Sequence, residues 1–375
     1  MLTLVYCAYV LFLSYAILQL FFAFKWLTIR QDNIYATQTT YFSVIVPFKN
    51  EESNLTNCIQ SILNQNYPPS NFEILLIDDH STDQSQEIAL RFNENFPDLI
   101  QYKLSNGNGK KAAIATGIVN SKFQHIITID ADCTVDSKWL NNFDSYFIDS
   151  SESVIVGPVL LKPGRETAFH YFQALEFMGL NVITIVAGRN RYFYNGSGAN
   201  LGFTKSIYQK YRESESDKSI SSGDDIFLIA SAVEQKTRVI YPKNKSMVAY
   251  SQTETNWNAF INQRLRWGAK SRFYPTNLLF LTWLLPVLSS FGIVMILVLG
   301  CITFSFLFFE LLVFSLLLKF ATDYCLLKVG NDFYRSPGFR FFIISELYHI
   351  FYLNALSLRM LFSRNFNWKG RSLNK

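Results

Sequence analysis

Charged side chains are scarce in this chain of 375 residues, and they are unevenly spread. Asp, Glu, Lys and Arg make up 17% of the sequence and hydrophobic residues 49%, a balance too apolar for an ordinary soluble enzyme. No charged residue occurs at positions 2–24 or 273–309. Because roughly 20 consecutive apolar residues cross the hydrocarbon core of a bilayer, the missing charges predict an integral membrane protein.

The chain also lacks the cysteine and lysine patterns of several protein classes. Its five cysteines are far apart and form no C-x-x-C pair, which argues against a disulfide framework or a zinc site. The net charge of +5 is modest, and Lys and Arg form no long run. This pattern argues against nucleic acid as a partner and favours a basic surface beside anionic lipid.

Familiar nucleotide-binding and nucleophile motifs are absent as well. No G-x-G-x-x-G follows the first predicted strand, and no G-x-x-x-x-G-K-[ST] occurs, which argues against dinucleotide enzymes and P-loop ATPases. The four histidines are scattered, and no Ser-His-Asp or Cys-His set is evident.

The first apolar segment, residues 2–24, predicts a transmembrane anchor. No basic region precedes it and no small-residue cleavage site follows it, so we expect an uncleaved helix rather than a signal peptide. Lys25 and Arg30 come directly afterwards. By the positive-inside rule, the N-terminus then lies outside and the next domain in the cytoplasm.

Residues 273–375 predict a C-terminal membrane region. Its apolar length favours a hairpin with helices near 278–299 and 302–321 and a turn around Gly300. Glu310 falls inside the second helix, where burying a carboxyl group in the bilayer costs free energy. It would contact either an acceptor lipid or a neighbouring helix, and we expect helix packing.

A third apolar segment, residues 341–362, is interrupted by polar side chains. These fall on one broad face at helical spacing: Ser345, Glu346, His349, Asn354 and Ser357. The segment either crosses the membrane or lies in the interface as an amphipathic helix. A crossing would export the basic tail, against the positive-inside rule, so the interface is favoured.

The region between the membrane segments, residues 41–272, predicts an α/β domain. Apolar strands alternate with helical patterns, which indicates a mostly parallel sheet covered on both faces. The expected strands are 42–47, 73–78, 126–129 and 153–159, and the expected helices 54–63, 81–93, 112–119 and 226–233. In such sheets, ligands bind at the carboxyl ends of the strands.

Acidic pairs follow two of these strands. Asp78 and Asp79 end the second one, and Asp130 and Asp132 follow the strand 126–129. Carboxylate oxygens are the ligands that Mg²⁺ and Mn²⁺ prefer, and these cations often share them with the phosphates of a substrate. The two pairs on one sheet edge therefore predict a divalent metal site.

Three further motifs have both a functional and an ordinary structural interpretation. Residues 107–111, Gly-Asn-Gly-Lys-Lys, open a helix and would bind phosphate, or they form a simple turn. Asp225, in Ser222-Gly223-Asp224-Asp225, is a general base or a helix N-cap. Residues 263–267, Gln-Arg-Leu-Arg-Trp, would clamp phosphate and a sugar face, or they form a juxtamembrane belt of basic and aromatic residues.

Together these motifs resemble a membrane-bound glycosyltransferase of family 2 with the GT-A fold. The resemblance covers residues 40–272 and the tail Trp368-Lys369-Gly370-Arg371. The segments that carry it are Val46-Pro47-Phe48-Lys49-Asn50-Glu51-Glu52, Asp78-Asp79-His80-Ser81-Thr82-Asp83, Gly109-Lys110, Asp130-Ala131-Asp132, Gly198-Ala199-Asn200-Leu201-Gly202-Phe203, Gly223-Asp224-Asp225 and Gln263-x-x-Arg266-Trp267. His80 departs from the family, which usually has glycine there, so we interpret it as a variant of the backbone turn.

The resemblance implies roles for individual residues. Those on the nucleotide and donor side are Pro47, Glu51, Asp79, Lys110 and Asp130. Asp132, with Asp130, would hold Mg²⁺ or Mn²⁺ at the diphosphate. Asp225 would deprotonate the acceptor hydroxyl. Those that would close over the diphosphate and the acceptor are Asp224, Gln263, Arg266 and Trp267.

The implied activity is an inverting transfer from a nucleotide-sugar, expected to be a UDP-sugar, to a lipid-linked or membrane-associated glycan acceptor. The expected location is a bacterial inner membrane, with a role in the cell envelope. Two alternatives stay open: a processive polysaccharide synthase, and an inactive scaffold subunit. Residues 169–186 would form either an interface helix that brings in the acceptor or an ordinary core helix.

Overall fold

A computed structural model describes residues 2–148, 152–213, 224–270, 277–362, 365–368 and 371–374. The chain forms two compact units. The membrane unit comprises residues 1–29, 161–186 and 253–375, and the sheet unit comprises residues 30–160 and 187–252. The chain therefore leaves and re-enters each unit, whereas the sequence predicts a linear order of anchor, domain and membrane region.

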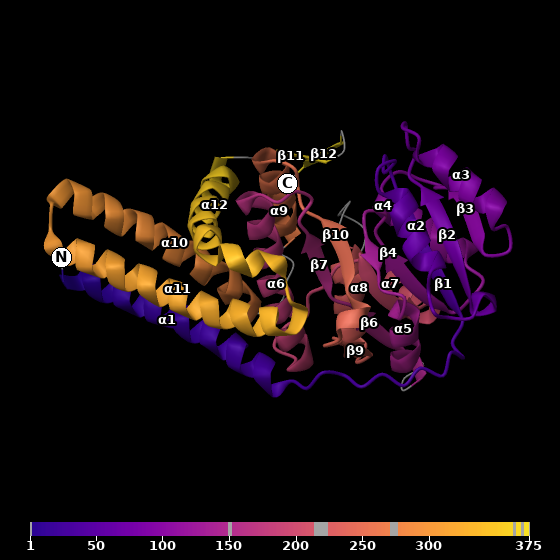
Figure 1. Cartoon of the computed structure of the whole chain (residues 1–375), viewed down its shortest axis with the longest axis horizontal. Helices are drawn as coiled ribbons and strands as arrows, with labels where there is room; N and C mark the ends of the chain where they lie inside the picture. Colours follow the sequence, from indigo (N-terminus) through magenta and orange to yellow (C-terminus); the bar gives the residue numbers. More distant parts are fainter. Residues whose placement is uncertain are drawn as a thin grey trace. The chain divides into compact units, whose positions relative to one another are not determined.

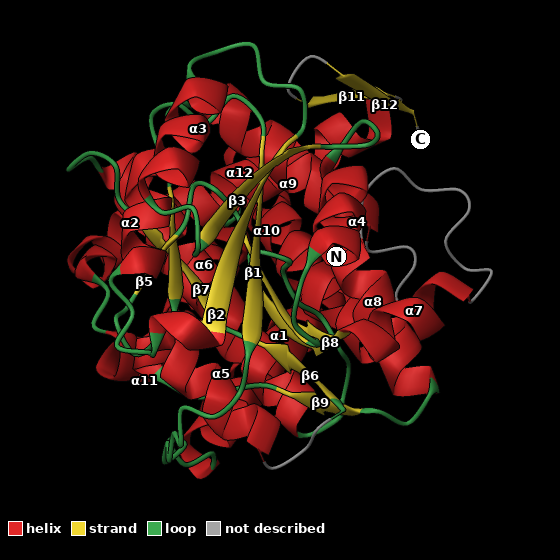
Figure 2. Ribbon diagram, turned by 90° about the vertical axis from the view of Figure 1, so that its right-hand side faces the viewer, coloured by secondary structure: helices red, strands yellow, loops and turns green. Residues whose placement is uncertain are grey.

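The sheet unit is built on seven strands in the order β3-β2-β1-β4-β8-β6-β9. Figure 2 draws the strands in yellow. Its helices and strands are β1 (Phe42–Phe48), α2 (Leu55–Leu63), β2 (Phe72–Asp78), α3 (Ser85–Asn95), β3 (Ile100–Leu104), α4 (Lys110–Asn120), β4 (His125–Ile129), β5 (Thr134–Val135), α5 (Trp139–Ile148), β6 (Ser153–Val156), β8 (Asn200–Thr204), α7 (Lys205–Glu213), α8 (Asp224–Glu234), β9 (Arg238–Ile240) and β10 (Ala249–Gln252). Short 3-10 turns lie at Pro69–Asn71 and Lys245–Met247.

The expected mostly parallel sheet is confirmed. β1 pairs in parallel with β2 and β4, and β2 with β3, so the carboxyl ends of β1, β2 and β4 share one edge. β8 runs antiparallel to both β4 and β6. All residues of β1 and β2 are buried, which explains their nearly continuous apolar sequences.

Two elements differ from the sequence-based expectation. α3 begins at Ser85 instead of residue 81, because the amides before it bind side chains: Ser81 N donates to Asp78 Oδ1 (2.8 Å) and Thr82 N to Asn50 Oδ1 (2.8 Å). The strand expected at 153–159 is interrupted at Gly157-Pro158, and β7 (Val159–Lys162) follows. Proline has no N–H to give to a ladder, which accounts for the interruption.

The membrane unit is helical. Its elements are α1 (Leu2–Thr28), α9 (Trp257–Lys270), α10 (Asn277–Thr303), α11 (Phe306–Tyr334), a 3-10 turn (Pro337–Phe341), α12 (Phe342–Phe362) and the hairpin strands β11 (Asn365–Trp368) and β12 (Arg371–Asn374). Most of α6 (Ala168–Arg189) belongs to it as well. α1, α10 and α11 run side by side (Figure 1). By length and apolar composition, α1, α6, α10 and the segment 337–359 could each cross a membrane.

The predicted turn around Gly300 is wrong. Gly300 lies inside α10, and the chain turns at Phe304 and Ser305, with Phe304 at a left-handed φ of 48°. Glu310, expected to pack against a helix, is exposed in the first turns of α11.

α12 turns its polar face inward. Ser345 and Glu346 are buried, whereas Leu347 and Phe351 on the opposite face are 54% and 63% exposed. A helix lying in the membrane interface would instead turn its polar face to water. The polar residues noted in the sequence therefore belong to the interior of the membrane unit.

Candidate active site

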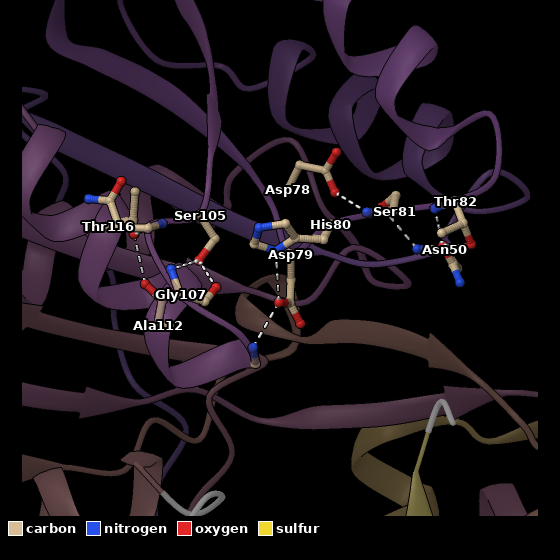
Figure 3. Close-up of polar contacts among 12 residues, drawn as sticks. Asn50, Asp78, Asp79, His80, Ser81, Thr82, Ser105, Gly107, Ala112 and Thr116 are labelled. Atoms are coloured by element: carbon tan, nitrogen blue, oxygen red, sulfur yellow. Dashed lines mark hydrogen bonds and ion pairs between the residues drawn. The ribbon is translucent and has the colours of Figure 1, made fainter. Parts of the chain in front are cut away.

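The end of β2 carries two buried carboxylates with fixed partners (Figure 3). Asp78 Oδ1 accepts a hydrogen bond from Ser81 N (2.8 Å), and Asp79 Oδ1 accepts one from Gly109 N (2.7 Å). The second bond ties the end of β2 to the start of α4. His80 follows with a left-handed φ of 59°, which explains why glycine would suit that position.

The end of β4 carries the second acidic pair. Asp130 accepts an ion-paired hydrogen bond from the Lys110 ammonium. Asp132 Oδ2 accepts one from Ser251 Oγ (2.7 Å), and its Oδ1 is 3.4 Å from Cys133 Sγ. β4 thus brings both carboxylates to the edge where β2 ends, as the sequence predicts.

Asp132 lies in surroundings that disfavour its negative charge. Burial, and then the neighbouring Asp130 carboxylate, raise the pKa of Asp132 above its usual value, while the Ser251 hydroxyl opposes the shift. A divalent cation would relieve both unfavourable effects. Mg²⁺ is commonly bound through one or two carboxylates plus substrate phosphates, so the oxygen ligands present here fit Mg²⁺ or Mn²⁺.

Lys110 is the positive centre of this region. Burial alone would lower the pKa of its ammonium, but the carboxylates of Asp130, Asp225 and Asp132 outweigh burial and raise it. Lys110 opens α4, as expected from the sequence. The Gly109 amide in front of it is bound to Asp79 and is therefore not available to a phosphate.

Asp225 approaches the same place from α8. Its Oδ2 accepts a hydrogen bond from Gly198 N (3.1 Å) and its Oδ1 one from Ile226 N (2.9 Å). A methyl group built at Gly198 would lie 3.8 Å from Asp225 Oδ2 and 3.7 Å from Lys110 Nζ. Asp225 therefore reaches across to the turn before β8 and does not act only as a cap of its own helix.

The other site residues predicted in this unit are Glu51, Pro47 and Asp224. Glu51 Oε2 accepts a hydrogen bond from Asn54 Nδ2 (2.9 Å), and the Glu51 amide donates to Ser85 Oγ (2.7 Å). Pro47 is buried within β1. Asp224 opens α8, but its side chain and residues 214–223 lie outside the described part of the chain.

Gln263, Arg266 and Trp267 lie on α9, in the membrane unit. Gln263 Nε2 donates to Glu254 Oε1 (2.8 Å). The neighbouring Arg264 is fully buried, pairs with Glu176 (2.5 Å) and lies 4.3 Å from the centroid of the Trp267 ring. The roles of Gln263, Arg266 and Trp267 at the diphosphate stay predictions.

The sequence did not point to Ser251 at all. It lies on β10, which pairs with β5 and so meets the loop after β4. No local motif surrounds it in the sequence, so only the strand pairing identifies it. The sequence motif 198–203 includes Gly198, but only the structure reveals its hydrogen bond to Asp225.

Comparison with known proteins matches residues 43–212 to the family model described as Glycosyl transferase family 2. A Methanococcus voltae protein, named dolichyl N-acetyl-alpha-D-glucosaminyl phosphate 3-beta-D-2,3-diacetamido-2,3-dideoxy-beta-D-glucuronosyltransferase, is 26% identical over 284 residues, 71% of this chain and 84% of that protein. Glycosyltransferase AglE from Haloferax volcanii is 31% identical over 119 residues, 32% of this chain and only 39% of that protein.

A solved structure shares the fold. The mannosyltransferase PcManGT from Pyrobaculum calidifontis, in complex with GDP-Man and Mn²⁺, superposes with a TM-score of 0.58 at 17% identity. The match covers 96% of this chain and 97% of that one. The match of residues 43–212 and the named relatives support a glycosyltransferase resembling those of family 2, and the solved structure shows the shared fold.

Proposed function

We propose that the protein is an inverting glycosyltransferase that moves a sugar from a nucleotide-sugar to a lipid-linked or membrane-associated acceptor. The convergence of Asp130 and Asp225 on Lys110 carries this proposal. Asp130, with Asp132, provides an acidic pair for the donor, and Asp225 provides a separate carboxylate for the acceptor. The two acidic functions come from different elements, β4 and α8, as a transfer between two substrates requires.

The donor would bind along the edge formed by β1, β2 and β4. Glu51 and Asp79 lie on the side proposed for base and ribose, and we expect a UDP-sugar. Asp130 and Asp132 would hold Mg²⁺ or Mn²⁺, which supplies charge stabilisation for the diphosphate. PcManGT, of the same fold, is described with Mn²⁺, in keeping with a metal in this site.

Asp225 would act as the general base. Its carboxylate takes the proton of the acceptor hydroxyl while that oxygen attacks the anomeric carbon and the bond to the diphosphate breaks. Lys110 and, by prediction, Arg266 offset the negative charge that develops on the departing nucleoside diphosphate. No covalent intermediate is needed.

The proposed acceptor is membrane-bound. The name of the Methanococcus voltae relative specifies a dolichyl-linked acceptor, and the membrane unit contains helices long enough to cross a bilayer. We place the sheet unit in the cytoplasm from Lys25 and Arg30, at a bacterial inner membrane. Because the polar face of α12 points inward, we also propose that α12 is embedded with the other helices.

A polymer-forming reaction with the same residues is the second candidate. A Staphylococcus aureus relative that is 24% identical over 224 residues is named poly(ribitol-phosphate) beta-N-acetylglucosaminyltransferase TarP, so a glycan acceptor is also compatible. The small number of candidate membrane helices among the described residues favours transfer of one or a few sugars. Separation of the products on a gel decides: a ladder of lengths would indicate a processive synthase.

The central experiment is a donor screen with the full-length protein in lipid, with release of nucleoside diphosphate as the readout. We expect metal-dependent release for one donor, and loss of release when a chelator removes the metal. Asp225→Asn should lower kcat by about 10²–10⁴-fold because it removes the base but keeps an oxygen for the Gly198 amide. Asp132→Ala should weaken metal activation.

Asp98→Asn provides the matched control, since Asp98 is an exposed carboxylate outside the site. It should behave like the wild type. If no nucleotide-sugar gives metal-dependent release and Asp132→Ala matches the wild type, the chain is an inactive scaffold and the proposal fails.

A further inference from the structure

The membrane unit contains a partly open cavity of about 100 Å³, lined by α1, α6, α10, α11 and α12. This volume is well beyond the roughly 10–15 Å³ that one water molecule needs. Apolar side chains such as Phe22, Leu180, Trp283 and Leu326 form most of its wall. Polar side chains also line it: Gln19, Glu176, Asp323, Ser345, Glu346 and His349.

Two oxygen atoms in this wall lack hydrogen-bond partners. Gln19 Oε1 on α1 and Ser345 Oγ on α12 make no hydrogen bond with any part of the chain that the structure describes. Both side chains are more than nine-tenths buried, with exposed fractions of 6% and 3%. Since a buried polar atom without a partner is costly, these oxygens point to a ligand that brings hydrogen-bond donors.

The charges around the cavity restrict the ligand. The Lys319 ammonium lies 2.5 Å from Asp323 Oδ2 and 2.6 Å from Glu346 Oε2, and Arg264 pairs with Glu176. Both cations are therefore already paired, and the described wall of the cavity contains three carboxylates but no lysine or arginine. A phosphate or carboxylate head group is therefore disfavoured.

A metal ion is not favoured either. Asp323, Glu346 and His349 offer ligand atoms within 4.8 Å of one another. However, the Lys319 ammonium already lies against both carboxylates, in the place that a cation would take. The apolar wall and the two oxygens without partners among the described residues fit a ligand that is neutral and largely apolar.

We propose that this cavity binds a neutral lipid whose head group carries hydroxyl groups. Its hydroxyls donate to Gln19 and Ser345, and its hydrocarbon lies against the apolar wall. The inference concerns only the membrane unit and does not depend on the proposed sugar transfer.

Lipid binding to the full-length protein, measured by native mass spectrometry from phosphatidylcholine nanodiscs, tests the proposal. The probes are monoglucosyl diacylglycerol and phosphatidylglycerol with the same acyl chains. We expect the neutral glycolipid to bind at least about tenfold more tightly. Ser345→Ala and Gln19→Leu should each weaken its binding roughly three- to tenfold, the range of one hydrogen bond.

Ser290→Ala is the matched control. Ser290 on α10 is also fully buried, and its hydroxyl has no hydrogen-bond partner among the described residues, but it does not line the cavity. It should leave lipid binding unchanged. Preference for phosphatidylglycerol, absence of glycolipid binding, or equal effects of Ser345→Ala and Ser290→Ala would overturn the inference, whatever the result of the nucleotide-release assay.

Discussion

Asp130 and Asp132 are two positions apart, yet they have different surroundings. Asp130 is ion-paired with Lys110, whereas Asp132 has the hydroxyl of Ser251 and the thiol of Cys133 beside it. The cation beside Asp130 already compensates its charge. In the part of the chain that the structure describes, Asp132 forms no such ion pair, so it is the stronger candidate for a metal ligand, and Asp130 for the donor side.

Ser251 is expected to position Asp132. Ser251→Ala removes the 2.7 Å hydrogen bond to Oδ2, so the carboxylate is oriented less well. We predict that the Mn²⁺ concentration for half-maximal nucleotide release rises about tenfold, with little change in kcat at saturating metal. Ser251→Thr keeps the hydroxyl and should restore the wild-type value. An unchanged metal requirement in Ser251→Ala would contradict this role.

Asp144 stabilises the segment between α1 and β1. The carboxylate is fully buried and accepts hydrogen bonds from the amides of Thr37 (2.8 Å), Gln38 (2.8 Å) and Thr40 (2.9 Å), and from Tyr67 OH (3.1 Å). Burial alone would raise the pKa of Asp144, but these hydrogen bonds outweigh it and lower the pKa below the usual 3.8.

The lowered pKa of Asp144 determines how the stability of the protein changes with pH. A lowered folded-state pKa means that the stabilisation is present above about pH 4 and is lost as the pH falls through the folded-state value. We predict that Asp144→Ala reduces the free energy of unfolding by about 2 kcal/mol at pH 7, because it removes the acceptor of the buried Thr40 amide and of two partly buried amides. The melting temperature between pH 3 and pH 7 measures both effects. Equal losses at both ends of this range would contradict the prediction.

At the scale of elements, α11 offers two lysine–aspartate pairs with the same spacing in different surroundings. Lys319–Asp323 is buried and also engages Glu346 of α12, whereas Lys328–Asp332 is largely exposed. Removing one partner of a buried ion pair leaves an uncompensated charge. The same removal at an exposed pair has little effect because water solvates the remaining charge.

We therefore predict that Lys319→Ala lowers the stability of the membrane unit by about 3 kcal/mol or more. Lys328→Ala should change it by less than about 0.5 kcal/mol. Thermal unfolding of both variants in the same detergent provides the comparison. Similar melting temperatures for the two would show that the buried pair does not link α11 to α12.

At the scale of the whole molecule, the sheet unit is not one continuous segment. The apolar helix α6 interrupts it, and the side chain of Phe172 packs in the membrane unit with Phe260, Tyr352 and Leu353. An isolated fragment 30–252 would leave this apolar face uncovered. We predict that this fragment aggregates or stays with the membrane.

Sedimentation after carbonate extraction measures the behaviour of the fragment. As a control, a version in which a flexible Gly/Ser linker replaces residues 161–186 should be more soluble, since the apolar face is removed. A soluble, monomeric 30–252 fragment would show that α6 does not need the membrane unit.

Local sequence determined much of this protein. Apolar runs, and the polar residues that bound them, predict β1, β2, β4 and the long helices. For the strands, burial on both faces leaves a continuous apolar pattern. Acidic pairs at strand ends predict the site edge, because parallel strands bring their carboxyl ends together. The left-handed φ of 59° at His80 agrees with the backbone turn expected there.

Tertiary structure decided which distant groups meet. Ser251 reaches Asp132 through the pairing of β10 with β5, and Asp225 reaches Gly198 from a helix 27 residues away in the sequence. It also decided that the polar face of α12 points to the interior, where Lys319 compensates Glu346. Helical spacing alone places polar residues on one face, but it does not specify whether protein or water covers that face.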